Sequence, residues 1–540
     1  MLDLFSQRMR SQYFFKDFSA SIVVFLVALP LCMGVAMASG ATVIQGILSG
    51  IIGGIVVGAI SGSSVSVSGP AAGLIIVVET ALADLDKITP GQAFGMFALA
   101  VFIAGLVQIL LGVLKLGSIA DFIPVSVIKG MLAAIGIILI LKEIPHLIGY
   151  DRDPIGEQEF LQKDGHNTFS ELYFSLKNIT PLAFIIGILG LVVQFIWEKP
   201  FVKKSWVSMI FPAPLIVVLL GVSFNEIAKH WYPDYAIVGA EHMVQVPVFS
   251  EDGSIIKAFN SLGSILVMPK WSSFTEFGIW KVAFVIAIIA SVESLLSLEA
   301  GDKLDKGSKD SAPNRELVAQ GVGNVFAGLV GALPITAVIV RTSANIQAGA
   351  KSKLSAMMHG LWLLIFVLFA PKIINLIPLS ALAAVLTYVG YKLAKPSLFK
   401  EQHARGNAAL IPFVVTIIAI LLTDLLIGVT IGLVLGFYFV LKTNFHRAFT
   451  VVHNENSTMI RFNSQATFLN KSLLKKHLLD LESSDSSVIF DLSNCTFIDN
   501  DITDIIADFV EHGKNIKLHV DFKYSNETQK NKFEKQLALN

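Results

Sequence analysis

The chain has 540 residues, with 41 acidic and 41 basic side chains, and therefore no formal net charge. Apolar residues make up 54% of the chain, charged residues make up only 15%, and the mean hydropathy is +0.68. These values exclude an ordinary soluble protein, give no sign of a nucleic-acid partner, and predict a polytopic helical membrane protein. The two cysteines, Cys32 and Cys495, form neither a disulfide framework nor a metal-ligand cluster, and we expect no metal and no cofactor.

The N-terminal segment, residues 1–17, is polar and carries three basic side chains, Arg8, Arg10 and Lys16. The first apolar run begins at Phe18 and is long enough to span a bilayer, which needs about 20 residues. We therefore expect a cytoplasmic N-terminal segment without a cleaved signal peptide.

Residues 18–441 hold about fourteen apolar segments, which we interpret as the transmembrane domain. They fall into two groups, residues 18–224 and 280–441, with about seven segments in each group and a polar stretch between them. Because an odd number of crossings turns the second group upside down, this pattern predicts a seven-plus-seven inverted repeat.

The distribution of basic residues predicts the orientation of the chain, since cytoplasmic loops carry the excess of lysine and arginine. With the N-terminus inside, the cytoplasmic loops hold basic side chains that include Lys199, Lys303, Arg315, Lys351 and Lys392. The opposite loops, residues 84–89, 143–180 and 225–277, are acidic or mixed. The sequence therefore predicts a multi-pass protein of the cell (inner) membrane with both termini in the cytoplasm.

The third segment of each half is interrupted by residues that disfavour a helix. Residues 61–73 are rich in Ser and Gly and lead to Pro70, where we expect a short helix to begin. Residues 331–350 contain Pro334 and lead through Arg341. Such broken segments at matching places mark the central site of a transporter, and their helix N-termini favour an anion.

Three polar side chains stand in strongly apolar surroundings in the predicted spans. Arg341 is the clearest, because a cation at mid-membrane costs about 2.5 to 3.5 kcal/mol on insertion scales and is therefore expected to serve function. The alternative role for Arg341 is a structural salt bridge. For Gln108 we favour a hydrogen bond between helices, and for Lys129 a side chain that extends to the membrane surface.

Glu293 lies among apolar residues in the helix predicted at the start of the second half. A carboxylate at this depth suggests a proton relay, a cation ligand or a partner for Arg341. Ser297 is four residues further and shares its face, so that Glu293 and Ser297 could form an oxygen-lined ion-coupling site with Thr336 or Thr342.

Beyond Leu441 the apolar spans stop, and a pattern of alternating strands and helices predicts a separate cytoplasmic domain over residues 450–540. We predict strands near residues 457–462, 466–470, 487–491 and 515–522. Helices are predicted near residues 471–481 and 502–512.

The chain resembles the SulP anion transporters in Ala28-Leu29-Pro30, in Ser68-Gly69-Pro70, and in the stretch from Pro334 to Asn345. This resemblance implies a core and a gate domain, a dimer, and an anion bound between the third and tenth segments. Carried over by position, the substrate-binding residues are Pro70, Ala71, Ala72, Gly73, Val340, Arg341 and Thr342. Leu31 and Ala71 replace polar residues of some relatives, and Glu293 stands where sodium-using relatives have aspartate, which keeps both Na⁺ and H⁺ open.

The segment from Val488 to Asp499 resembles a STAS domain, the expected C-terminal partner of a SulP membrane region. STAS relatives that act as phosphorylation switches have a serine directly after the aspartate. Asn500 and Asp501 stand there in this chain, which excludes that switch. We expect Asp499 to cap a helix.

These features predict a secondary active transporter of a small oxyanion such as sulfate, bicarbonate or a dicarboxylate, and not an enzyme. The expected partners are this inorganic or carboxylate anion, the lipid bilayer, and a second copy of the chain in a homodimer. Two alternatives remain, a nucleobase-type permease of the same architecture and an anion channel or sensor that signals through the STAS domain.

Overall fold

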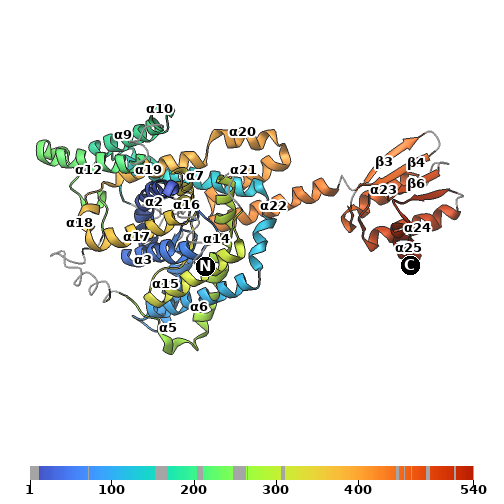
Figure 1. The fold of residues 1–540 in the computed structure, drawn as a ribbon, viewed down its shortest axis with the longest axis horizontal. Coiled ribbons are helices and arrows are strands. Elements are labelled where there is room, and N and C mark those ends of the chain that lie inside the picture. Colours follow the sequence, from blue (N-terminus) through green and yellow to red (C-terminus); the bar gives the residue numbers. More distant parts are fainter. Residues whose placement is uncertain are drawn as a thin grey trace. The chain divides into compact units, whose positions relative to one another are not determined.

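The protein is described by a computed structural model in which the chain forms two compact units, residues 1–433 and 434–540 (Figure 1). The structure describes residues 11–70, 72–152, 167–203, 211–246, 248, 263, 266–305, 310–445, 449–454, 457–463, 465–481, 487–515 and 518–538.

The first unit is helical, and its main elements form two series of seven. Seven helices of the described residues are long and apolar enough to cross a membrane, and three more apolar helices are shorter. The predicted polytopic helical class is confirmed. The first series is α2 (Ser11–Ala38), α3 (Val43–Ile52) continued through a π turn by α4 (Gly58–Ile60), α5 (Ile75–Ile88), α6 (Ala93–Val113), α7 (Val125–Leu147), α9 (Pro181–Trp197) and α12 (Ala213–Trp231). The second is α14 (Phe277–Leu304), α15 (Pro313–Val330), α16 (Ile339–Gln347), α17 (Leu354–Phe369), α19 (Leu379–Leu393), α21 (Asn407–Leu422) and α22 (Leu425–Phe445).

Helix packing follows the relation expected of an inverted repeat. Helix α2 packs on α17, and its counterpart α14 packs on α6. In the same way α9 packs on α19, and α21 packs on α7. When each helix is replaced by its counterpart in the other series, the first contact of each pair becomes the second. An inverted repeat, which the odd number of crossings predicts, has this relation. The first helix begins earlier than predicted, because residues 11–17 already form its first turns.

These helices form two bundles with separate apolar cores. The core bundle, residues 11–113 and 277–369, surrounds a cluster that includes Leu29, Phe97 and Ile286. The gate bundle, residues 125–231 and 379–433, surrounds a second cluster that includes Met131 and Phe413. One face of α2, α14 and α16 contributes to this second cluster, so the bundles meet along these three helices. Four short helices lie between the main elements: α8 (Thr168–Ser175), α10 (Pro200–Lys203), α18 (Pro371–Ile374) and α20 (Pro396–Ala404).

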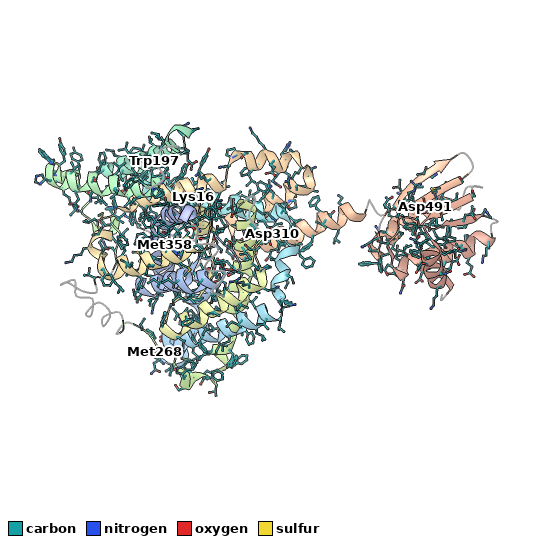
Figure 2. All side chains as sticks on the ribbon, viewed as in Figure 1. Lys16, Trp197, Met268, Asp310, Met358 and Asp491 are labelled. Atoms are coloured by element: carbon teal, nitrogen blue, oxygen red, sulfur yellow. The ribbon has the colours of Figure 1, made fainter. Side chains whose placement is uncertain are left out.

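The second unit is an α/β fold with its own apolar core. Its four-stranded sheet has the order β3-β4-β6-β8, with β3 antiparallel to β4 and the other neighbours parallel. Asp491, labelled in Figure 2, ends β6 and accepts a hydrogen bond from Arg461 Nε of β4 at 3.0 Å. The strands are β3 (Phe449–Asn454), β4 (Ser457–Phe462), β5 (Gln465–Ala466), β6 (Ser487–Asp491), β7 (Phe497–Ile498) and β8 (Val520–Lys523). The helices are α23 (Lys471–Leu481), α24 (Asn500–Asn515) and α25 (Glu527–Ala538).

The predicted elements of this unit are correct in part. Strands β4 and β6 and helix α23 have the predicted bounds. The strand predicted over 466–470 is wrong after Ala466, because Asn470 Oδ1 accepts the Thr467 N–H and residues 468–470 form a helical turn. The last strand begins only at Val520, since α24 continues to Asn515.

Three elements of the second unit, β3, the two-residue strand β7 and α25, were not predicted, and the side-chain cap expected of Asp499 is not seen among the described residues. Strand β3 is the outer strand of the sheet, and α25 is largely polar with Phe533 buried, so that both give weak apolar patterns. Asp499 directly precedes α24, but its carboxylate accepts the N–H of Phe468 at 3.2 Å.

Candidate functional site

Two short strands meet in the core bundle and begin the two broken segments. Strand β1 (Ser68–Pro70) pairs antiparallel with β2 (Ile335–Ala337), with Gly69 opposite Thr336. A helical turn, Ala72–Leu74, and α5 follow β1, while α16 follows β2 almost at once. The structure thus contains both predicted interruptions. Pro70 ends the strand and does not begin the helix as predicted, because it pairs with Ile335.

Polar side chains from α14, α15 and α6 hold the ladder in place. Asn324 accepts the Ile335 N–H at 2.7 Å and donates to the Ile335 carbonyl at 2.9 Å, in the manner of a neighbouring strand. It also donates to Gln108 Oε1 at 2.7 Å, which confirms the predicted hydrogen bond between helices. Ser294 Oγ accepts the Ala337 N–H at 3.1 Å. Asn324 was not among the predicted site residues, although an asparagine inside an apolar helix is a signal for such a bond.

Arg341 lies in the first turn of α16 and is fully buried. Its Nη2 donates to the Pro70 carbonyl at 3.3 Å, whereas Nε and Nη1 have no hydrogen-bond partner in the part of the chain that the structure describes. No carboxylate lies within ion-pair distance of it among the residues that the structure describes. A structural salt bridge at Arg341 and the pairing of Arg341 with Glu293 are therefore wrong. A buried guanidinium with free donors is costly unless an anion completes its interactions.

The other predicted substrate residues surround the ladder in different ways. Val340 is buried in the apolar cluster of the gate bundle. The Thr342 hydroxyl oxygen accepts the Val67 N–H at 3.1 Å, so it already has a structural role. Ala72 and Gly73 lie in the turn that leads into α5. Ala71 is outside the described residues.

Glu293 approaches the start of this turn from α14. A β-carbon built on Gly73 would lie 3.1 Å from Glu293 Oε2, and the Gly73 N–H interacts with the carboxylate. The side chain is buried, and Oε2 has no hydrogen-bond partner. A carboxylate here is stabilised by the positive end of the helix that follows. The turn that leads into α5 in the first repeat therefore contacts Glu293 of the second repeat.

The remaining predicted coupling residues are buried nearby in the core bundle. Thr336 in β2 is fully buried, and its Oγ1 lacks a partner. Ser297 is also buried, but Ser294 is the serine of α14 that contacts β2. Among the described residues, no hydrogen bond joins Glu293, Ser297 and Thr336. Among the described residues, Glu293 Oε2 and Thr336 Oγ1 thus have no hydrogen-bond partner; both oxygens could ligate a cation, and the carboxylate alone could take up a proton.

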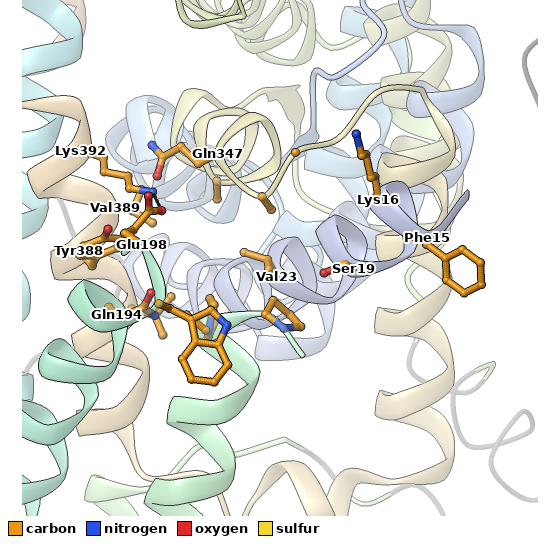
Figure 3. Close-up of a pocket in the computed structure, with 18 of the residues that line it drawn as sticks. Phe15, Lys16, Ser19, Val23, Gln194, Glu198, Gln347, Tyr388, Val389 and Lys392 are labelled. Atoms are coloured by element: carbon orange, nitrogen blue, oxygen red, sulfur yellow. Dashed lines mark hydrogen bonds and ion pairs between the residues drawn. The ribbon is translucent and has the colours of Figure 1, made fainter. Parts of the chain in front are cut away.

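A cavity of about 830 Å³ opens between the two bundles (Figure 3). It reaches Ala344, one turn beyond Arg341 in α16, but none of the predicted substrate or coupling residues lines it. Three lysines and one glutamate lie around it, and Figure 3 shows the ion pair of Lys392 with Glu198. The amide Nε2 of Gln194 is buried there without a partner. This basic cavity is suited to admit an anion. Its charged lining residues are Lys16, Lys351, Lys392 and Glu198.

Lys129 forms an ion pair with a partly exposed acidic side chain, a contact that was not predicted. Its Nζ lies 2.6 Å from Glu401 Oε1 of α20. The pairing arises because α20 is a connecting helix that packs against α7, a contact that the sequence pattern does not reveal.

The variant Gly69→Ala is expected to disturb the site directly, because a β-carbon at Gly69 would overlap Arg341 Nη1. The guanidinium would have to leave its place beside the ladder. We expect a loss of about 1 to 3 kcal/mol in the free energy of unfolding and a weaker apparent anion affinity. Thermal unfolding and sulfate uptake measure the two effects. Gly95→Ala is the matched control, since its nearest neighbour would be at 3.4 Å. Wild-type values for Gly69→Ala would contradict this account of the site.

Comparisons with known proteins identify the family. The model of the sulfate permease family matches residues 14–419. The chain is 29% identical to the putative sulfate transporter YvdB of Bacillus subtilis, over 83% of this chain and 77% of that protein. It is 27% identical to the bicarbonate transporter BicA of Picosynechococcus sp., over 77% of this chain and 68% of that protein. The solved structure of SLC26A9 superposes with a TM-score of 0.67 at 16% identity, covering 100% of this chain and 88% of that one, and shows the same fold. The chain therefore belongs to the sulfate permease family.

Proposed function

We propose that this protein is a secondary active transporter of a small oxyanion, bound between the starts of the helices that follow β1 and β2. The observation that carries the proposal is Arg341, a buried cation at the start of α16 whose Nε and Nη1 have no hydrogen-bond partner among the described residues, with the Cys32 thiol close to the guanidinium. Its position beside the Pro70 carbonyl brings this charge to the ladder itself. A family whose members include a putative sulfate transporter and a bicarbonate transporter agrees with an oxyanion.

The two bundles provide a means of moving the anion. In this proposal the core bundle carries the ladder and both helix starts, and it moves against the gate bundle along α2, α14 and α16. The basic cavity beside Ala344 is then the cytoplasmic approach to the site. Lysines at its edge would concentrate anions before they bind.

We propose that Glu293 couples transport to protons. Its carboxylate interacts with the backbone N–H of Gly73, whereas a sodium site requires several oxygen ligands. The oxygen of Thr342, one candidate ligand, is occupied by the Val67 N–H. Sodium coupling is the second candidate, favoured by the unpartnered Thr336 Oγ1. A strict requirement for sodium in wild-type uptake would establish the second candidate.

Competition in proteoliposomes tests the transport proposal. Radioactive sulfate uptake is measured with bicarbonate, a dicarboxylate or uracil present outside. We expect saturable uptake that one of the oxyanions inhibits and uracil does not. Inhibition by uracil alone would favour the nucleobase-type permease. Flux that does not saturate and exceeds the ordinary turnover range of about 1 to 10³ per second would favour a channel.

The expected assembly in the membrane is part of the same proposal. We propose a homodimer in the inner membrane, with both termini and the C-terminal α/β unit in the cytoplasm. The α/β unit is proposed to be a STAS domain that supports dimer contacts or regulation, and no enzymatic activity is proposed.

A chain that ends after Arg447 is expected to insert and fold. The two apolar cores of the helical unit contain no residue beyond 433, and the α/β unit has a core of its own. Size-exclusion chromatography and uptake should show a folded protein with weaker dimers or altered transport. A shortened chain with full transport and an unchanged oligomeric state would contradict the proposed role of the α/β unit.

A further inference from the structure

A cluster of titratable side chains lies at the C-terminal end of α7, outside the site described above. The carboxylate of Asp151 bridges two histidines, with Oδ1 2.7 Å from His146 Nδ1 and Oδ2 2.6 Å from His242 Nδ1. The Asp151 side chain is 2% exposed, and that of His242 is 22% exposed. A single buried carboxylate thus holds two imidazoles that come from distant parts of the chain.

The surroundings of the two histidines are mainly acidic. Lys142 and Glu143 face them from α7, Glu171 from α8, and Glu241 from the turn that contains His242. Lys142 Nζ lies 3.8 Å from Glu171 Oε2, and His242 Nε2 lies 3.9 Å from Glu241 Oε1. The carboxylates of Asp151 and Glu241 therefore favour the protonated form of His242.

His242 belongs to the connection that runs from the gate bundle to the core bundle, between α12 and α14. On one side, Ile237 in this connection exchanges hydrogen bonds with Asn225 of α12. On the other, the Val244 N–H donates to the Ile377 carbonyl at 3.0 Å, and the Val246 N–H donates to Asn375 Oδ1 at 2.7 Å.

Asn375 and Ile377 belong to another connection between the bundles, from α17 to α19. The isolated bridge between Met243 and Pro378 joins the same two segments. These two of the three connections between the bundles are therefore bonded to each other, and the contact of His242 with Asp151 fastens them to the end of α7.

We propose that His242, Asp151 and His146 form a pH-sensitive clasp that fastens both connections to the gate bundle when His242 is protonated and releases them as the pH rises. The clasp lies on the side of the membrane predicted to be outside. The clasp would make the mobility of these two connections depend on external pH, independently of the coupling residue Glu293.

The direction of the effect follows from the two groups outside the membrane spans. The hydrogen bond to Asp151 raises the pKa of His242 above its ordinary 6.5, although burial opposes this. The resulting stabilisation is complete below that ordinary value and is lost as the pH rises through the raised pKa. Burial raises the pKa of Asp151, but the hydrogen bonds from His146 and His242 outweigh it and lower that pKa below 3.8. The Asp151 contribution is therefore lost only in strong acid, and the clasp opens on the alkaline side.

Amide hydrogen exchange of the purified full-length protein in detergent tests the clasp. The exchange rates of peptides containing Val244 and Val246 are measured at pH 6 and at pH 9. Each rate is then divided by the intrinsic rate of the unprotected peptide at the same pH. We expect normalised exchange about tenfold faster at pH 9, as for the loss of a charge-assisted hydrogen bond. His242→Gln should exchange fast at both pH values. The matched control is His230→Gln, an exposed histidine of α12 that makes an edge-to-face contact with Trp231; this variant should behave like wild type.

A second variant keeps the proposal testable if His242→Gln does not fold. His242→Arg retains a cation at both pH values, so protection of the two peptides should persist at pH 9. Equal normalised protection of the wild type at both pH values would overturn the clasp. A wild-type pH dependence in His242→Gln or in His242→Arg would also overturn it. Because exchange is read without any anion flux, these results do not depend on the proposed transport activity.

Discussion

Replacing Glu293 by glutamine is expected to abolish uphill anion uptake driven by an inward proton gradient. The amide cannot take up a proton, but it retains the size of the side chain and its place beside Gly73. Exchange of anion at equal concentrations should therefore continue at a rate near that of the wild type. Uptake into proteoliposomes with and without a pH gradient measures both quantities in one preparation.

Glu299→Gln is the matched control for this experiment, because Glu299 lies on the same helix. Its carboxylate is 3.8 Å from Lys303 at the end of α14, away from the ladder. We expect this variant to keep gradient-driven uptake. Proton-driven accumulation that survives in Glu293→Gln would remove Glu293 from the coupling step.

Arg341→Gln is expected to weaken the apparent anion affinity by about tenfold to a hundredfold. A hydrogen bond to a charged group contributes about 1.5 to 3 kcal/mol, and each 1.4 kcal/mol corresponds to a factor of about ten. The melting temperature should not fall, because the guanidinium has no carboxylate partner among the described residues and its burial is itself unfavourable. Concentration-dependent uptake and thermal unfolding separate the two effects.

Two further variants sharpen the test of Arg341. Arg341→Lys retains the charge without the planar pair of donors, and we expect an intermediate affinity. Arg315→Gln removes an exposed arginine of the same bundle, which donates to the Ile60 carbonyl, and should leave affinity unchanged. An unaltered affinity in well-folded Arg341→Gln would show that the anion does not use this side chain.

Much of the fold follows from the sequence because membrane spans depend on composition over about 20 residues. The two interruptions could be predicted because Gly, Pro and Ser disfavour helices within a short window. The antiparallel ladder could not, since Gly69 and Thr336 are brought together only by the packing of two repeats. The pairing of Pro70 with Ile335 could not be predicted either, because it depends on the same packing.

The direction of individual side chains was the hardest feature to predict. The sequence indicates that Arg341 and Glu293 lie deep in the protein. It does not indicate which backbone groups near the ladder each side chain contacts. Arg341 reaches the Pro70 carbonyl, and Glu293 reaches Gly73. The partners of Lys129 and Asn324, Glu401 and Gln108, were missed for the same reason, because each partner lies on a helix distant in the sequence.

The ladder between β1 and β2 also constrains how such a carrier could work. Its three residue pairs bond the first repeat to the second at the point where both short helices begin. Asn324 and Ser294 fix the same strand from two further helices. Displacing α5 against α16 would break these bonds, so the two helix starts travel as one rigid body. In the proposed transporter, the anion would therefore be carried from one side to the other in an unchanged binding geometry, and opening and closing would take place at the surface between the bundles.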